Sequence, residues 1–250
     1  MMLRRLGPFL IVAAFIGAWW LAATGSLIFP TPPQVVLAVG ELFREGTLVQ
    51  HVTASLFRVS VGYLSAVLVA IPVGSLMGWF PAVRHALNPI VQLLRPISPI
   101  AWIPIAILWF GVGDMSPIFL IFLASFFPVV VATAAGVSLV EPQYVRAARN
   151  FGVRGLELYR VAIFPAALPQ IITGMRVGLG VAWLVVVAAE MVAINSGLGY
   201  LIIDARNAGT RYDLVVAGMA MIGLIGFGLD VVMRRLETLD EVRWRYDGTR

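Results

Sequence analysis

Long apolar runs separated by short polar segments dominate this chain. A helix of about 20 apolar residues crosses a hydrocarbon core of about 30 Å, and six runs approach or exceed that length. We therefore predict an all-α polytopic membrane protein with six transmembrane helices. The predicted spans lie near residues 8–27, 58–80, 97–112, 116–138, 170–194 and 213–233.

The third predicted span is short and contains Pro96, Pro99 and Pro104. Because proline lacks an amide proton and clashes with the preceding helical turn, we expect this span to begin irregularly. Its free carbonyls would then depend on neighbouring helices. The chain has no linker, low-complexity tract or clear internal repeat, so we expect residues 1–250 to form a single domain.

The first apolar run follows Arg4 and Arg5, as the core of a signal peptide would, and residues 22–24 resemble a weak cleavage site. The run is longer than a typical signal core and includes Trp19 and Trp20, which favour a membrane interface. We therefore expect an uncleaved first helix.

Arginines are concentrated in alternate loops of this topology. With an internal amino terminus, thirteen lie inside: Arg4, Arg5, Arg84, Arg95, Arg146, Arg149, Arg154, Arg160, Arg234, Arg235, Arg243, Arg245 and Arg250. Three lie outside: Arg44, Arg206 and Arg211. Arg58 and Arg176 fall in or near spans. The positive-inside rule then predicts that both termini, the segment 141–169 and the tail 234–250 are cytoplasmic.

The net charge of +5 follows the same loops and forms no stripe interleaved with aromatic residues. This distribution favours topology control and contact with anionic lipid headgroups, and it does not favour binding of nucleic acid.

The composition excludes several kinds of enzyme. Hydrophobic residues make up 60% of the chain and charged residues 12%, which is typical of a membrane protein. There is no lysine, so neither a P-loop nor a Schiff base can form, and no cysteine for a thiol nucleophile or a thiolate metal site. The two histidines, His51 and His85, lie in separate segments. Any energy source must therefore be in another polypeptide.

Between the first two spans, Pro32 and Pro33 are expected to start a short amphipathic helix that ends near Glu45. We expect it on the outer membrane surface. An interfacial helix and a docking site for an external protein both fit these residues.

The segment 141–169 is an arginine-rich insert between two apolar spans. Pro142 suits a first helical turn, Glu141 favours the positive end of the helix dipole, and Gly152 can end the helix with a positive φ. One face carries an apolar ridge of Val145, Ala148 and Phe151.

After Gly152 and Gly155 we expect a second short helix, which Pro165 and Pro169 stop before the next span. Two stiff helices with a glycine joint can transmit the displacement of a cytosolic partner. A loop helix lying on the inner leaflet fits the same residues.

The run of Ala147, Ala148 and Gly152, with Phe164-Pro165 and Pro169, resembles the cytoplasmic EAA loop of bacterial ABC importer permeases. The sequence departs from that pattern at Arg146, where an acidic residue is usual, and at Ala162 and Phe164, where aliphatic residues are usual. The resemblance implies a coupling helix that contacts a cytosolic ATPase. The implied coupling residues are Val145, Arg146, Ala147, Ala148, Phe151, Gly152 and Pro165.

Residues 93–131 and 174–202 resemble the permeases of the nitrate, bicarbonate, sulfonate and taurine group. The resemblance implies a type I permease fold in the bacterial inner membrane, in which two copies form the pathway above two ABC ATPase subunits. A periplasmic or lipid-anchored binding protein would deliver substrate. ATP and Mg would bind in the ATPases, and this chain would hold no cofactor.

The expected substrate is a small oxyanion or organic sulfonate, carried by alternating access. Organic cations and vitamin precursors such as pyrimidines are the alternative, because permeases for them look similar. An ATP-independent carrier and an integral membrane enzyme are further alternatives, for which the sequence provides neither a clear ion-coupling site nor a paired-carboxylate motif.

Polar residues and tryptophans within the spans are candidates for the pathway. Glu190 could line it, but pairing with an arginine or a structural hydrogen bond is the simpler expectation. Arg176 could attract an anion or extend to the headgroups, and Asp230 is expected to pair with an arginine. Trp102 and Trp183 could line the pathway or pack in the core.

Overall fold

The structure, a computed structural model, describes residues 2–26, 28–209 and 211–237, and this part of the chain is helical with no β-strand. In chain order the elements are α1 (Met2–Ala23), α2 (Pro32–Arg44), α3 (Thr47–Trp79), α4 (Pro81–Leu94), η1 (Pro99–Trp102), α5 (Ile103–Phe110), α6 (Met115–Ser138), α7 (Pro142–Asn150), α8 (Gly155–Leu158), η2 (Tyr159–Ile163), α9 (Phe164–Ala193), α10 (Leu198–Asn207) and α11 (Tyr212–Glu237).

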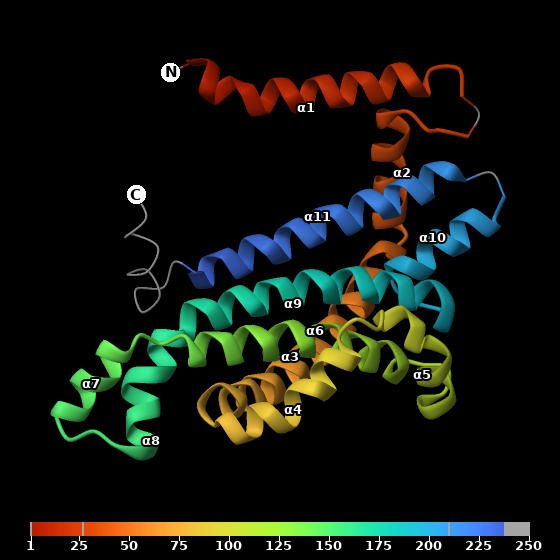
Figure 1. The fold of residues 1–250 in the computed structure, drawn as a ribbon. Coiled ribbons are helices and arrows are strands. Elements are labelled where there is room, and N and C mark those ends of the chain that lie inside the picture. Colours follow the sequence, from red (N-terminus) through yellow and green to blue (C-terminus); the bar gives the residue numbers. More distant parts are fainter. Residues whose placement is uncertain (1, 27, 210, 238–250) are drawn as a thin grey trace.

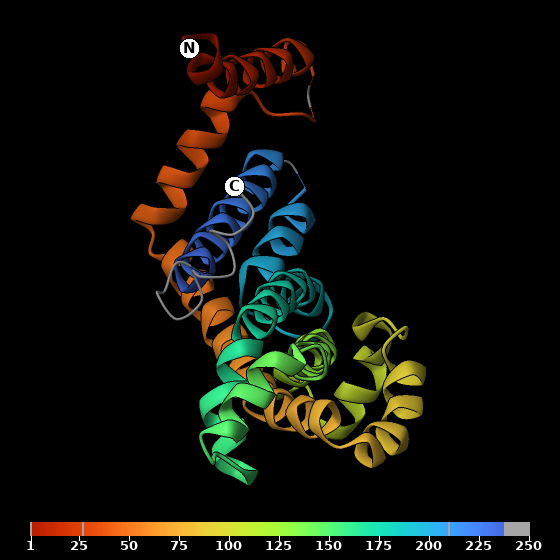
Figure 2. The same cartoon turned by 60° about the vertical axis from the view of Figure 1, so that its left-hand side comes forward.

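Helices α3, α6 and α9 form the centre of the bundle, with α6 packed against both of the others (Figure 1). Glycines allow these helices to approach closely. A Cβ added at Gly74 of α3 would lie 2.6 Å from the Cβ of Thr133 on α6, and one added at Gly174 of α9 would lie 2.2 Å from the Cβ of Ala132. Helix α4 packs against α3 and α5 packs against α6, while α10 and α11 lie on the other side of α9 (Figure 2).

Two ends of the bundle can be distinguished in Figure 1. At the α7 end lie α7, α8 and the start of α9, and the described ends of α1 and α11 lie on the same side. At the α2 end lie α2, α10 and the break between α9 and α10.

Four helical segments are long and apolar enough to cross a membrane: α3, α6, α11 and the continuous segment of α8, η2 and α9. The helices α4 and η1–α5 qualify as a fifth span if they count as one, although they are bent by 84°. The apolar part of α1, Leu10–Ala23, is shorter. By length and composition, the described residues contain four candidate spans, or five if the bent pair is one span, and the sixth, α1, stays a prediction.

The third predicted span, residues 97–112, contains the helical stretch Pro99–Phe110, which is too short to cross a membrane by itself. It corresponds to η1 and α5, and the preceding α4, which the prediction omitted, belongs to the same bent pair. The break at residues 95–98 contains Pro96 and ends at Pro99, where the missing amide protons prevent a continuous helix. An irregular beginning was therefore predicted correctly.

Two other helices begin earlier in the chain than predicted. Helix α3 begins at Thr47 instead of residue 58, and its 33 residues extend about 50 Å at 1.5 Å per residue. It is therefore longer than a hydrocarbon core of about 30 Å. Helix α9 begins at Phe164 instead of residue 170.

Helix α2 forms as predicted between Pro32 and Arg44, and it buries Val35, Ala38 and Leu42. It crosses the end of α11, where Arg211 contacts Glu41 of α2 at 2.7 Å. Hydrogen bonds from Arg211 hold the pKa of the half-buried Glu41 carboxyl below its usual value.

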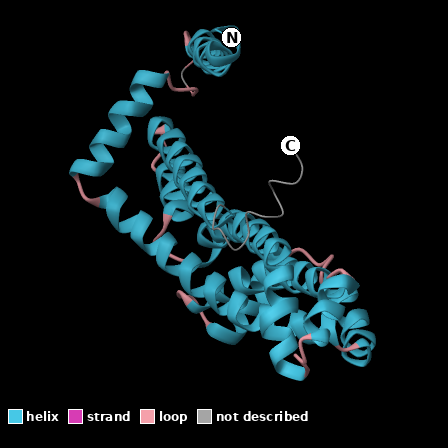
Figure 3. Ribbon diagram, turned by 90° about the vertical axis from the view of Figure 1, so that its left-hand side faces the viewer, coloured by secondary structure: helices cyan, strands magenta, loops and turns pink. Residues whose placement is uncertain are grey.

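Helix α1 stands apart from the central helices (Figure 3). It contacts α2, and the Trp19 Nε1 group donates a hydrogen bond to the carbonyl of Pro30 at 3.1 Å. Large apolar side chains of α1 are exposed, with Phe15 and Leu21 at 72% and 77%. An apolar helix without neighbours on most of its sides must be covered by lipid or by another protein chain.

Candidate functional site

Helix α7 follows the predicted local rules. It begins at Pro142, with Glu141 at its N-cap, and ends at Asn150. Gly152 has a φ of +85°, and the Val153 amide donates to the Ala148 carbonyl at 3.2 Å. The predicted start of this helix and its termination by a glycine with positive φ are both confirmed.

The apolar ridge predicted on α7 is divided between two faces. Val145 and Ala148 are half-buried and pack against a core cluster that includes Leu158 and Ile171. Phe151, by contrast, is 88% exposed. The prediction of one shared ridge was wrong because the α8–η2–α9 segment folds back under α7 and covers its inner face.

The outer face of α7 remains open. Arg146 and Ala147 are exposed beside Phe151, and Arg149 and Asn150 are exposed next to them. A small residue between an arginine and an aromatic residue allows close approach of another surface. Their role in coupling stays a prediction.

The helix after Gly155 does not end at Pro165 or Pro169, contrary to the prediction from the sequence. Residues from Gly155 to Ala193 form one helical segment, with a π-helical turn over Tyr159–Ile163. Pro165 lies in the first turn of α9, where its missing amide proton is tolerated, and Pro169 lies inside α9. The helix therefore continues past both prolines, and a π-helical turn before them accommodates the local change in backbone geometry.

The helical segment that follows α7 is held against α3 by aromatic and hydroxyl contacts. The Tyr159 hydroxyl donates to the Ser75 Oγ at 2.7 Å, and the rings of Tyr159 and Trp79 stack with centroids 4.8 Å apart. A displacement of α8 would therefore act directly on the C-terminal end of α3.

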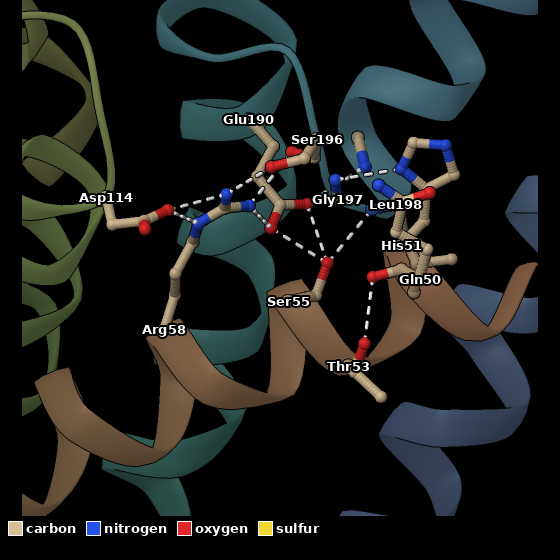
Figure 4. A network of polar contacts seen from close by, with 11 residues as sticks. Gln50, His51, Thr53, Ser55, Arg58, Asp114, Glu190, Ser196, Gly197 and Leu198 are labelled. Atoms are coloured by element: carbon tan, nitrogen blue, oxygen red, sulfur yellow. Dashed lines mark hydrogen bonds and ion pairs between the residues drawn. The ribbon is translucent and has the colours of Figure 1, made fainter. Parts of the chain in front are cut away.

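Apart from α7, a cluster of polar side chains lies at the α2 end and centres on Arg58 of α3 (Figure 4). Its Nη1 donates to Glu190 Oε1 at 2.8 Å and to the Ser196 carbonyl at 2.9 Å. Its Nη2 donates to the Ser196 Oγ at 2.5 Å and contacts Asp114 at 2.7 Å, and its Nε donates to Asp114 at 2.8 Å. These contacts match the five N–H groups of a guanidinium.

The carboxylate of Glu190, on α9, also has hydrogen-bond partners for both of its oxygens. It accepts hydrogen bonds from the Ser55 Oγ at 2.8 Å and the Gly199 amide at 3.0 Å. The Ser55 Oγ in turn accepts a hydrogen bond from the Leu198 amide at 2.9 Å. Arg58 is 2% exposed and Glu190 is 0% exposed, so both charges are removed from solvent.

Two glycines make room for this site. Gly197 has a φ of +105°, and a Cβ added there would lie 2.2 Å from the carboxyl carbon of Glu190. A Cβ added at Gly199 would lie 2.2 Å from the Val187 carbonyl oxygen. No other residue fits either position without movement of the break between α9 and α10.

We call the set of Ser55, Arg58, Asp114, Glu190 and Ser196 the Arg58 network. It joins three elements: α3, the N-cap of α6 at Asp114, and the end of α9 with the break that follows. Helices α6 and α9 are also the two helices that the segment 141–163, with α7 and α8, joins at the opposite end. The network therefore fixes the far ends of the helices that carry α7 and α8.

The other predicted pathway residues lie in different surroundings. Trp183 is 6% exposed and its Nε1 donates to the Ile222 carbonyl at 3.0 Å, so it packs between α9 and α11. Arg176 pairs with Asp230 at 2.7 Å, and both line a cavity of about 440 Å³ between these helices. Trp102 lines a separate cavity of about 150 Å³.

The expectation that Glu190 pairs with an arginine or forms a structural hydrogen bond is confirmed, as is the pairing of Asp230 with an arginine. Arg58 was not predicted as the partner of Glu190, and the roles of Ser55, Asp114 and Ser196 were not predicted either. Two opposite charges in separate apolar spans were the available signal.

With this architecture in view, the chain belongs to the family of binding-protein-dependent transport system inner membrane components, whose model matches residues 70–239. It is a multi-pass inner-membrane permease, the transport subunit of an ABC importer and not an enzyme. Membership implies association with an ATPase and a substrate-binding protein.

Individual relatives agree with this assignment. The taurine transport system permease protein TauC of Escherichia coli (strain K12) is 42% identical over 90% of this chain and 85% of its own length. The putative aliphatic sulfonates transport permease protein SsuC of Bacillus subtilis (strain 168) is 35% identical over 96% and 87%. The nitrate import permease protein NrtB of Leptolyngbya laminosa is 35% identical over 87% and 81%.

The fold matches a solved structure, an inward-facing conformation of the MetNI methionine ABC transporter. The TM-score is 0.61 at 19% identity, and the match covers 76% of this chain and 95% of that chain. The type I permease fold expected from the sequence is therefore confirmed.

The Arg58 network predicts an asymmetric response to mutation. The single substitution Arg58→Met leaves the Glu190 carboxylate buried without its partner, which we expect to destabilise the protein by about 3–5 kcal/mol. The double substitution Arg58→Met with Glu190→Met removes both charges and should recover much of that loss. Thermal unfolding of the purified permease in detergent measures both. A single variant as stable as the wild type, or less stable than wild type by the same amount as the double variant, would contradict the network.

Proposed function

We propose that this chain forms the pathway of an ATP-driven importer for a small oxyanion or organic sulfonate. The observation that carries the proposal is the set of relatives named for taurine, aliphatic sulfonates and nitrate, because sulfonates and nitrate share a small oxygen-rich anionic group.

We propose that α7 docks on an ABC ATPase subunit, which binds ATP and Mg. Support comes from the exposed face of Arg146, Ala147 and Phe151, and from the burial of Val145 and Ala148, which holds α7 against the membrane helices. Gly152 and Gly155, both with positive φ, join α7 to α8 and can localise bending.

The functional unit in this proposal contains two copies of the permease and two ATPase subunits. The exposed apolar surface of α1 supports a second copy, because α1 leaves most of its sides without a protein neighbour, and lipid would cover the remainder. A homodimer places two α7 helices over a symmetric pair of ATPases.

We propose that the α7 end faces the cytoplasm and that both termini lie there. The ends of α1 and α11 on the same side as α7 support this orientation, as does the excess of arginines in the predicted inner loops. The α2 end then faces the periplasm, where a soluble or lipid-anchored binding protein delivers substrate.

In the proposed cycle, ATP binding closes the ATPase pair and draws the two α7 helices together. The displacement passes through α8 to α3, by way of Tyr159, Ser75 and Trp79, and through α9. Because helices are stiff, the pathway changes from inward-facing to outward-facing, and ATP hydrolysis resets it.

The substrate class is tested with the permease reconstituted into liposomes together with its ATPase and binding protein. We expect ATP-dependent uptake of one or more of taurine, nitrate, bicarbonate and an alkanesulfonate, and no uptake of choline or a pyrimidine. Uptake of choline or the pyrimidine alone would contradict the anion proposal. Uptake that persists without the ATPase would contradict the importer mechanism.

The glycine joint predicts a selective loss of coupling. Gly152→Val should insert normally, since a Cβ there meets nothing within 4 Å, but a φ of +85° is strained for valine and will misplace α7. We expect substrate-stimulated ATP hydrolysis by the reconstituted complex to fall about tenfold or more. Gly46→Val is the matched control, because its φ is +77° with equally open space in the α2–α3 joint. Equal ATPase activity in the two variants would count against the role of Gly152.

A further inference from the structure

We infer that Arg95 forms an anion-binding site at mid-depth in the membrane, on the pathway itself, for the oxyanion or sulfonate group of the substrate. The inference rests on the proposed import of a small anion and adds a site that the sequence analysis did not contain. It corrects the placement of Arg95, which the loop count had assigned to the cytoplasmic side.

The depth of Arg95 follows from its neighbours. It lines the cavity of about 150 Å³ together with Leu123, Phe127 and Pro128, which lie in the middle of α6 (Met115–Ser138). Val181, in the middle part of α9, lines the same cavity. Arg95 is therefore at the level of the membrane centre and not in a cytoplasmic loop.

The charge of Arg95 is not neutralised by the protomer. Its side chain has no ion pair or hydrogen bond within residues 2–26, 28–209 and 211–237, whereas Arg58 and Arg176 each contact a carboxylate. Arg95 is also exposed in the single chain. An unpaired charge facing lipid at this depth is costly, so intramembrane arginines face a water-filled cavity or a protein interior.

The backbone beside Arg95 offers further donors. Arg95 opens the break between α4 and η1, where the chain bends by 84°. Within the described part of the chain, neither the amide nor the hydroxyl of Ser98 has a hydrogen-bond partner, and the Ile100 amide has none either. Irregular backbone at membrane depth is tolerated where it lines a cavity, and such broken helices form substrate sites in transporters.

The cavity has a size suited to a small ion. Its volume of about 150 Å³ is large enough for several water molecules or one small ion. Trp102 forms part of its wall, with Ala124 and Phe127. A guanidinium in an otherwise apolar wall suits an oxyanion, because its planar N–H donors match the oxygens of the anion.

The test uses the natural absence of cysteine. Ser98→Cys places a single thiol at the break, in the permease reconstituted with its ATPase and binding protein. Two thiol reagents of similar size are compared: 2-sulfonatoethyl methanethiosulfonate, an anion, and 2-(trimethylammonium)ethyl methanethiosulfonate, a cation. We expect the anionic reagent to react faster by about fivefold or more, because Arg95 concentrates anions at the thiol.

Two further variants assign that preference to Arg95. Ser98→Cys with Arg95→Gln should lose the preference for the anionic reagent. Ser98→Cys with Arg84→Gln should keep it, because Arg84 is an exposed arginine of the same helix, α4, away from the break. An unreactive thiol, equal rates for the two reagents, or equal loss in both double variants would overturn the inference.

Measurements of anion uptake distinguish a failure of this inference from a failure of the proposed function. In the cysteine-free chain, Arg95→Gln should raise the KM for the transported anion about tenfold while leaving ATPase association unchanged. If wild-type permease transports an anion and Arg95→Gln has an unchanged KM, the Arg95 site is wrong and the importer stands. If the wild type transports none of the anions, the proposed substrate class is wrong, and the labelling rates alone decide whether the Arg95 site exists.

Discussion

The buried ion pair between Arg58 and Glu190 fixes the α2 end of the bundle. Both side chains are removed from solvent, so each charge is tolerable only because its partner lies 2.8 Å away and the remaining donors and acceptors are satisfied. That requirement determines the local backbone as well. The chain after α9 must leave the helix and return past Glu190, and Gly197 and Gly199 provide the space. The backbone groups after α9 form hydrogen bonds with the side chains of His51, Ser55, Arg58 and Glu190, which permits irregular structure there.

The Arg58 network also determines how a displacement of one helix is transmitted to the other helices. It holds α3, α6 and α9 together at one end, and the segment 141–163 joins α6 to α9 at the other. A displacement of α7 therefore acts on helices whose far ends are tied. Close glycine contacts, such as Gly74 against Thr133, make the three helices a stiff unit between these ends. In the proposed cycle, the unit moves against its copy in the second permease, and the wall that carries Arg95 moves with it.

Local rules predicted much of this structure. Proline and glycine positions were sufficient for α2 and for the start and end of α7, because caps and turns depend on neighbouring residues. The failures involve distant contacts. The bend between α4 and α5 places Arg95 at mid-depth although its sequence context resembles a loop. Glu190 was expected to pair with an arginine, but its partner Arg58 is 132 residues away in the chain, and a single sequence cannot reveal which spans are adjacent.

The central claim is that ATP binding moves α7 and that this motion opens the pathway. The most direct measurement is the distance between spin labels at Ala147→Cys in the assembled complex, where each permease copy contributes one label because the chain has no other cysteine. The labels should lie on the exposed face of α7. The account predicts a shorter label-to-label distance with ATP bound and hydrolysis blocked than without nucleotide. An unchanged distance in a complex that transports substrate, or the absence of any label pair, would contradict it.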